Sequence, residues 1–240
     1  MYKRQGLQLV DTKDWNVRLN ASYNTNHNKV LSIGNAVPFA IGGFSSRTVQ
    51  TVVAEGEPVG FIRGYKAVLN PDNSLKEILP LQNLGSTLPT AYGNFSLSAS
   101  YKNLSFMLSG DYQYGAYVHS FDRQFRFSKG LKDDAIPEKA LEGLDQGANW
   151  LNFTNFFVEK SDFLKIRNIG IAYDYKPKKY LKSVNLAFNV YNPFAFTASS
   201  VDPEAALAGA RSQGAVAVGG LNYSSYSTPR QYVGTIRVSF

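Results

Sequence analysis

Residues 95–114, FSLSASYKNLSFMLSGDYQY, contain the pattern that decides the fold. On both sides of Lys102-Asn103, apolar or aromatic residues occupy every second position, and mostly polar residues lie between them. Because successive side chains of a strand point to opposite faces, each half predicts a strand with one apolar and one polar face. Two residues are the length of a tight hairpin turn, so the two strands are predicted to be antiparallel neighbours.

Further segments predict strands of the same kind. Alternation with period two continues over residues 15–24, 184–191 and 232–240, and Leu7 with Leu9 indicates a strand near the beginning of the chain. From Phe163 to Tyr175 the apolar parity changes across Arg167-Asn168, where a β-bulge would keep the apolar residues on one side. The sequence therefore predicts an all-β fold with about seven antiparallel strands.

Strand and connection lengths favour a transmembrane β-barrel over a soluble sandwich. The alternation lasts for roughly nine to eleven residues in the best segments, as tilted membrane strands require, and Tyr and Trp lie near the ends of the apolar faces. Short connections (residues 11–14, 102–103 and 176–182) alternate with long ones (27–90, 120–162 and 194–229), which is typical of periplasmic turns and extracellular loops. Seven strands cannot close such a barrel, so we expect another chain or further sequence to complete the wall.

Composition excludes several classes of function. The chain has no cysteine, which removes disulfides, thiolate nucleophiles and Cys-based zinc sites. It has no apolar run of about 18 residues that would predict a transmembrane helix, and its first ten residues lack the apolar core of a signal peptide. The net charge of +7 comes from scattered Lys and Arg, so no nucleic-acid partner is expected.

Several passages resemble the SusC/RagA branch of TonB-dependent transporters of the Bacteroidetes. The strongest is FVEKSDFLKIRNI at residues 157–169, which is similar to the family's FVEDGSFLRLKNL strand, followed by GIAY (170–173) in place of the family's LGY ending. Further similarities are VYNPF (190–194) to GQNLF, VDPE (201–204) to YDPE, TPRQY (228–232) to LPRT, EGEPVGFIRGYK (55–66) to VGxPIGxFYGYK and LGSTLPTAYG (84–93) to IGNPNPxFxYG. The Gly/Ala-rich stretch from Ala205 to Gly220 departs from the family pattern.

The resemblance implies that residues 1–240 are the C-terminal part of a TonB-dependent receptor in the cell outer membrane. The complete barrel would have about 22 strands around an N-terminal plug, with the plug and the first strands outside this chain. The implied partners are the rest of the barrel and plug, TonB acting through the missing N-terminal part, a SusD-like surface lipoprotein, outer-membrane lipid and the barrel-assembly machinery. Phe240 matches the family's terminal Phe, so Ile236, Val238 and Phe240 are expected to form an assembly signal.

Energised import of a glycan, an oligopeptide or a similar large nutrient is the preferred functional hypothesis, without an enzymatic step or a cofactor. A structural or secretion-associated outer-membrane barrel that acts as a docking partner is the alternative. A soluble β-rich binding module is a third interpretation of the alternating strands.

Catalytic and metal sites find little support in the sequence. His27 and His119 have no metal-ligand spacing around them, and both are interpreted as solvated surface residues. The acidic cluster of residues 133–145 is interpreted as the solvated face of a short amphipathic helix rather than as a calcium or carboxylate site. This helix is predicted over Ile136 to Leu144, with Pro137 in its first turn.

Two further groups are candidates for contact with a solute. Polar residues predicted to face the barrel lumen, where contact with plug or water is the plainer interpretation, are Arg18, Asp111, Gln113, Asn185, Asn189 and Arg237. Loop aromatics that could stack on sugar rings or grip a peptide or lid protein, with ordinary loop packing as the plainer interpretation, are Phe61, Tyr65, Tyr223 and Tyr226.

Overall fold

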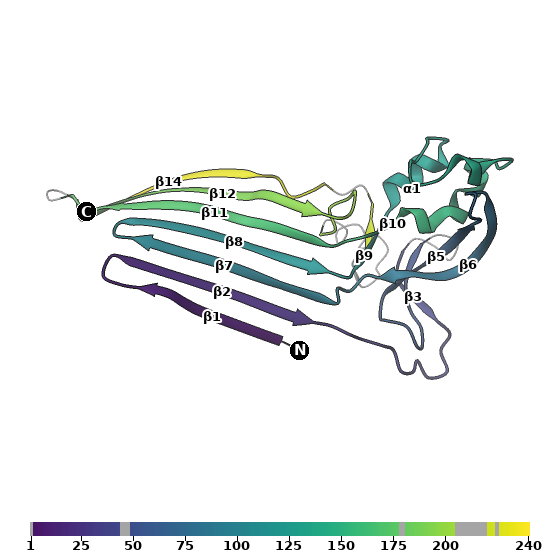
Figure 1. The fold of residues 1–240 in the computed structure, drawn as a ribbon, viewed down its shortest axis with the longest axis horizontal. Helices are drawn as coiled ribbons and strands as arrows, with labels where there is room; N and C mark the ends of the chain where they lie inside the picture. The colour runs from purple at the N-terminus through teal and green to yellow at the C-terminus, as the bar shows by residue number, and fades with distance from the viewer. Residues whose placement is uncertain (1, 44–48, 178–180, 205–219, 224–225) are drawn as a thin grey trace.

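The computed structural model describes residues 2–43, 49–177, 181–204, 220–223 and 226–240. Seven long strands form one antiparallel sheet, here called the main sheet, in the order β1-β2-β7-β8-β11-β12-β14. Figure 1 shows them side by side along the length of the molecule. They are β1 (Tyr2–Asp11), β2 (Trp15–Thr25), β7 (Ala91–Tyr101), β8 (Leu104–Tyr114), β11 (Phe163–Tyr175), β12 (Ser183–Thr197) and β14 (Gln231–Ser239). The predicted strands and the hairpin at Lys102-Asn103 are confirmed.

Strand register gives the main sheet two chemically different faces. One row of directly paired residues crosses all seven strands and is apolar or aromatic throughout: Leu7, Leu19, Leu97, Leu108, Ile169, Val190 and Tyr232. A row on the opposite side contains one tyrosine and otherwise only glycine and polar residues: Gly6, Asn20, Ser96, Ser109, Asn168, Tyr191 and Gln231. We call these sides the apolar face and the polar face. A slip of one residue in any pair would mix them.

A β-bulge in β11 keeps this separation intact. The register of β11 shifts between Ile166 and Asn168 against both neighbours, and against β8 the extra residue is Arg167, as predicted. In β12 two residues, Asn192 and Pro193, lie opposite Arg167. The φ of Asn192 is 51°, in the left-handed region. The prediction that the loop begins at residue 194 was wrong, because β12 continues beyond this irregularity to Thr197. The irregularity accommodates a proline that has no N–H for the ladder.

Long connections and short turns lie at opposite ends of the main sheet (Figure 1). The long connections form a second body, here called the cap, from residues 26–43, 49–90, 115–162 and 220–223. Its four-stranded sheet has the order β3-β4-β5-β6, and its three-stranded sheet has the order β10-β9-β13. The described parts of the predicted long connections therefore contain strands and helices of their own.

The cap contains seven strands and four helical segments in the described chain. The strands are β3 (Phe39–Gly43), β4 (Gln50–Val53), β5 (Phe61–Leu69), β6 (Leu75–Ser86), β9 (Tyr117–Ser120), β10 (Val158–Lys160) and β13 (Leu221–Asn222). The helical segments are α1 (Phe121–Ser128), α2 (Gln146–Asn149) and the 3₁₀ helices η1 (Glu138–Leu141) and η2 (Trp150–Phe157).

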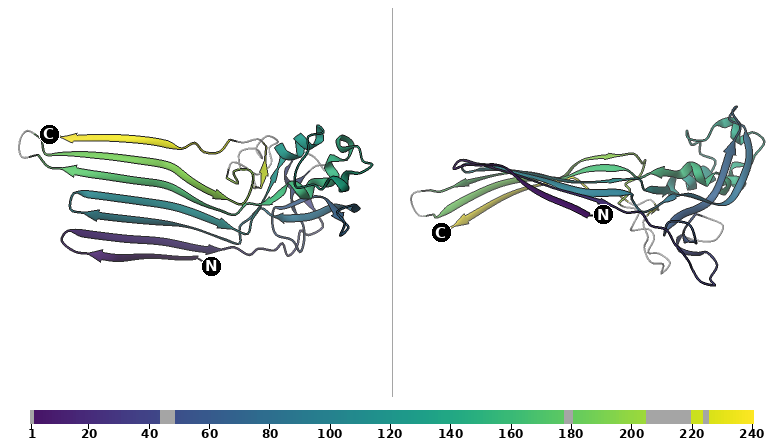
Figure 2. Two further views of the ribbon diagram at one scale, coloured as in Figure 1. Left: turned by 45° about the horizontal axis from the view of Figure 1, so that its top comes forward. Right: turned by 60° about the horizontal axis from the view of Figure 1, so that its bottom comes forward.

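The hydrophobic core lies in the cap. Phe127, Phe153 and Phe157 pack together in it. The ring centroid of Phe127 lies 5.7 Å from that of Phe153 and 5.5 Å from that of Phe157. A smaller cluster contains Ile62 and Leu221. Among the described residues, no hydrophobic side chain of the main sheet is buried, and Figure 2 shows this sheet as a single twisted layer. No described residue therefore covers its apolar face.

Two predictions in the cap were wrong. Residues 136–144 do not form an amphipathic α-helix: the main-chain bonds from Ala140 to Pro137 and from Leu144 to Leu141 are of the i to i−3 kind, so the segment contains only η1. His119 is 0% exposed: its ring lies against Gln124 of α1, and its strand β9 is the central one of the three-stranded sheet.

Residues 205–219, most of the Gly/Ala-rich stretch, lie outside the described chain, as do residues 178–180 of the predicted turn. Across the described ranges, no helix is long and apolar enough to cross a membrane. In the same residues the main sheet is open, since β1 and β14 each pair with a single strand.

Candidate functional site

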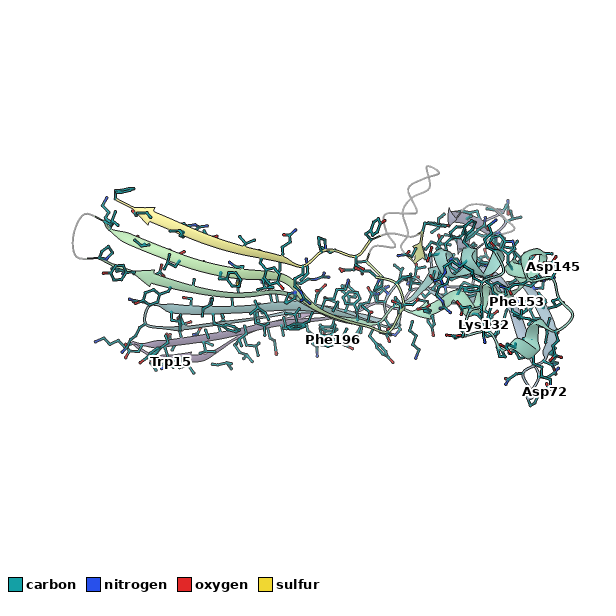
Figure 3. All side chains as sticks on the ribbon, turned by 90° about the horizontal axis from the view of Figure 1, so that it is seen from above. Trp15, Asp72, Lys132, Asp145, Phe153 and Phe196 are labelled. Carbon is teal, nitrogen blue, oxygen red and sulfur yellow. The ribbon has the colours of Figure 1, made fainter. Side chains whose placement is uncertain are left out.

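The apolar face presents large side chains to the surroundings over its whole length. Leu186, Phe188 and Ile236 are 45%, 48% and 72% exposed. Aromatic rings lie toward both ends: Trp15 packs against Tyr101 near the turns, with ring centroids 4.5 Å apart, and exposed aromatics including Phe196 lie near the cap (Figure 3). A continuous apolar surface of this kind on a soluble monomer is unusual and indicates contact with lipid or another apolar partner.

All six polar candidates from the sequence lie on the polar face, because each pairs across the ladder with other residues of that face. Arg18 pairs with Gln8 and donates from Nε to its Oε1 at 3.1 Å. Asn185 pairs with Arg237 and donates to Asp174. The remaining three are Asp111, Gln113 and Asn189. The register thus brings residues from four strands onto one surface.

A cluster of five charged side chains lies where the polar face meets the cap. Lys165 Nζ donates to Asp202 Oδ1 and to Glu204 Oε2, both at 2.6 Å. Arg167 donates from Nε and Nη2 to the two carboxylate oxygens of Asp111, at 2.5 and 2.8 Å, and from Nη2 to Glu204. Lys165 is only 5% exposed, so its charge depends on these carboxylates.

Two carboxylates of this cluster, those of Asp202 and Glu204, have surroundings that favour the ionised form. Burial is the largest single influence on Asp202 and alone would raise its pKa, but the hydrogen bond and positive charge of Lys165 together with main-chain hydrogen bonds from Glu204 and Thr228 lower the pKa overall. Burial likewise opposes the charge on Glu204, and hydrogen bonds from Arg167 and Lys165 outweigh it, so its pKa is also lowered. Both side chains therefore carry a full negative charge at neutral pH.

Two hollows are lined by residues of this cluster, and a third lies on the cap side, lined by Ser200, Val201 and residues of α1. The largest has a volume of about 560 Å³ and lies between the polar face and the cap. Among the described residues, Asp111 and Glu204 are its only charged lining residues, and it also presents the amide of Asn94 and the rings of Tyr117 and Phe163. Carboxylates, amides and aromatic rings together can hydrogen-bond and pack against part of an extended polar chain.

The four loop aromatics are placed differently. Phe61 is 4% exposed and is packed in the cap, so it offers no surface for stacking on a ligand. Tyr223 packs against Phe121 with ring centroids 5.0 Å apart, and burial raises its pKa to about 12. Tyr65 is half-buried, whereas Tyr226 is 97% exposed. Tyr226 therefore has the most accessible ring of the four.

The acidic cluster of the cap is largely used in internal contacts. Asp133 is paired with Arg123 at 2.5 Å and Asp145 caps α2 through the N–H of Ala148, so neither lies on a solvated helix face as predicted. Glu138 pairs with Lys132 at the surface. The other acidic residues of this cluster are Asp134 and Glu142. Within the described residues no group of His, Asp and Glu has an arrangement suited to a metal ion.

The two histidines differ in their surroundings. His27 is exposed, as expected. His119 Nε2 lies 2.6 Å from Gln124 Oε1, and burial lowers the pKa of His119 to about 4. It is therefore a neutral packing residue of the cap at physiological pH.

Lys165, Arg167, Asp202 and Glu204 were missed as a group by the sequence analysis. Their signal was present, because KIR and VDPE fall in two of the passages that resemble the same family. Contact between these passages is what the structure adds. β12 ends beside the beginning of β11, and the chain that follows it turns back so that Asp202 and Glu204 lie against Lys165.

Neither a protein-family model nor a curated protein matches the sequence. Solved structures match it over its full length. The structure of the RagAB peptide transporter aligns with 100% of this chain at a TM-score of 0.67 and 20% identity. The chain has the fold of the aligned part of that structure. The RagAB peptide importer in its closed-closed and open-open states aligns similarly, with TM-scores of 0.69 and 0.68 and identities of 20% and 19%.

The RagAB-like fold agrees with the resemblance derived from the sequence motifs, which is thus confirmed at the level of fold. The chain spans 29% to 30% of the length of the RagAB chains that it matches. Those relatives are described as transporters and not as enzymes.

Proposed function

We propose that this chain is the C-terminal part of an outer-membrane, TonB-dependent transporter of the SusC/RagA type, and that the complete protein imports a large nutrient. An oligopeptide is the first candidate for the cargo, because the structures with the same fold are described as peptide importers. A glycan is the second. No bond is made or broken in this mechanism, so selectivity comes from binding contacts.

The uncovered apolar face is the observation that carries the proposal. It lies on strands of 9 to 15 residues, long enough for tilted crossing of a bilayer, and the opposite face is polar. In a bilayer, lipid tails would cover the apolar face and remove its hydrophobic side chains from water, which lowers the free energy. The free backbone groups of β1 and β14 would be paired by the rest of the barrel wall, since unpaired groups in lipid cost several kcal/mol each.

The remaining assignments follow from this orientation. The polar face would line the lumen beside the plug, and the cap would lie outside the cell, where a SusD-like lipoprotein can contact it. TonB would act on the plug through a segment beyond this chain. Ile236, Val238 and Phe240, all exposed near the C-terminal end, would be the signal for the barrel-assembly machinery.

Heat modifiability and uptake together test the proposal. The full-length protein, extracted from outer membranes in detergent, should migrate faster on a gel before boiling than after it, as closed barrels do. Cells lacking the gene should lose uptake of labelled oligopeptides or glycans, and loss of TonB should have the same effect. A heat-modifiable barrel whose loss changes no uptake would favour the docking-partner alternative. A protein that folds and stays soluble without detergent would refute the membrane assignment.

A further inference from the structure

Residues 198–204 form a short segment, here called the strap, that follows β12 and crosses the junction between main sheet and cap. At its beginning, the N–H of Ala198 donates to the carbonyl of Asp162 at 2.9 Å. In its middle, Ser200 donates to the Glu159 carboxylate from its N–H at 2.5 Å and from Oγ at 2.7 Å. At its end, Asp202 and Glu204 accept hydrogen bonds from β11.

The strap is bound by charged residues both in the cap and in the main sheet, here called the cap anchor and the sheet anchor. The cap anchor is Glu159 of β10, which is also paired with Arg123 of α1, and Arg123 is in turn held by Asp133. The sheet anchor consists of Lys165 and Arg167, which bind Asp202 and Glu204. Charged contacts therefore run from the cap through the strap to the polar face.

These polar contacts are the main attachment of the strap. Among the described residues, none of residues 198–204 belongs to either hydrophobic cluster of the cap. A segment without core contacts can open locally while the sheet and the cap remain folded. The energy that holds it closed then depends on a few charge-assisted hydrogen bonds, each of which can shift an equilibrium about tenfold or more.

The strap also contributes to the walls of all three hollows. Pro203 and Glu204 line the largest one, of about 560 Å³. Ser200 and Val201 line a second hollow of about 420 Å³ on the cap side. Ser199 and Asp202 line a third hollow of about 190 Å³ near the beginning of β11. Moving this one segment would therefore change all three.

We propose that residues 198–204 form a charge-held partition between these hollows, and that release of the sheet anchor joins them and opens a path to the polar face. This deepens the proposed function, on which it rests for its meaning in transport. The partition itself is a property of the described residues and is tested without any cargo.

Hydrogen exchange in the full-length protein tests the anchor. Asp202→Asn with Glu204→Gln removes both carboxylates and should speed exchange of the amides of residues 198–202 and 204 by about tenfold or more, while amides of β11 and β12 keep their protection. Lys139→Gln is the matched control, because it removes a cation from an exposed cap ion pair, with Asp72, that does not touch the strap. Unchanged exchange in the double variant would overturn the proposal.

A further variant covers the case in which unpaired Lys165 prevents folding. Adding Lys165→Met to the double variant removes the buried cation together with its partners, so no isolated charge is left. This triple variant should also show fast exchange at 198–204 with protected β11 and β12. Protection equal to that of the parent protein would show that other contacts hold the strap.

Thiol reactivity tests the opening of the path. The chain has no cysteine, so Gln113→Cys places its only thiol on the half-buried wall of the largest hollow. A charged thiol reagent added outside intact cells should modify this cysteine several-fold faster in a protein that also carries Asp202→Asn and Glu204→Gln than in the protein with Gln113→Cys alone. Adding Lys139→Gln to Gln113→Cys should leave the rate of modification unchanged. Faster exchange without faster modification would refute the partition. Absence of uptake by the parent protein would instead refute only the proposed function.

Discussion

Arginine substitutions at two consecutive positions of β8 should reveal which face of the main sheet contacts lipid. Phe106 lies on the apolar face between Ala99 and Ile171 and is 38% exposed. Met107 lies on the polar face between Ser98 and Gly170 and is 45% exposed. The two side chains are similar in exposure and in position along the strand, so the substitutions differ mainly in the face that receives the charge.

The expected difference follows from the medium on each side. Arginine at the middle of a bilayer costs a barrel about 2–4 kcal/mol, and Phe106 is two residues from Leu108, roughly 7 Å along the strand from the middle of the apolar face. We therefore take about 2 kcal/mol, and add about 1 kcal/mol for the apolar packing that the ring provides. Phe106→Arg should lower the free energy of unfolding by about 3 kcal/mol, and Met107→Arg by less than about 1 kcal/mol.

The assay is denaturant unfolding of the full-length protein in lipid vesicles, followed by tryptophan fluorescence. A loss of about 3 kcal/mol corresponds to a change of roughly 100-fold in the unfolding equilibrium constant, well outside the error of such titrations. A sheet with water on both faces would tolerate both substitutions within about 0.5 kcal/mol. Equal effects of the two variants, large or small, would refute the assignment of the apolar face to lipid.

Three further predictions concern packing and protonation. Phe153→Ala should destabilise the cap by about 3–5 kcal/mol, seen as faster hydrogen exchange there with little change in the main sheet, because its ring is fully buried. Gly93→Ala should lower the heat stability of the barrel, because its Cβ would overlap the carbonyl oxygen of Ser22, whereas Gly234→Ala meets nothing within 4 Å and should be neutral. Cap stability should fall by on the order of 3 kcal/mol as pH drops from about 6.5 to about 4, because His119 has a pKa of about 4 when folded and the unfolded chain binds the proton first; His119→Gln should remove this dependence in pH-dependent exchange.

The strands of the main sheet could be predicted because each carries its own signal. Period-two alternation needs no knowledge of neighbours, and even the bulge at Arg167 is visible as a change of parity. The continuation of β12 to Thr197 could not be predicted in this way. Pro193 reads as the end of a strand, and only pairing with β11 shows that the ladder resumes beyond it.

The cap was harder to predict, because its short elements are stabilised by contacts between distant segments. Phe127 and Phe153 lie in different helical segments, and alternation within either segment does not show that they pack together. The sheet that contains His119 takes β10 and β13 from two other parts of the chain. Short elements of this kind carry weak local signals, so tertiary packing decides their form.

The sequence by itself determined which residues share a face of the main sheet, because the alternation of side chains along a strand is a local property of the backbone. It also determined the order of short and long connections. Only the tertiary structure decided that Lys165 and Arg167 meet Asp202 and Glu204, since hydrogen bonds between distant segments depend on where the chain returns. The two faces of the main sheet are thus present in the pattern, whereas the strap and its hollows exist only in the folded chain.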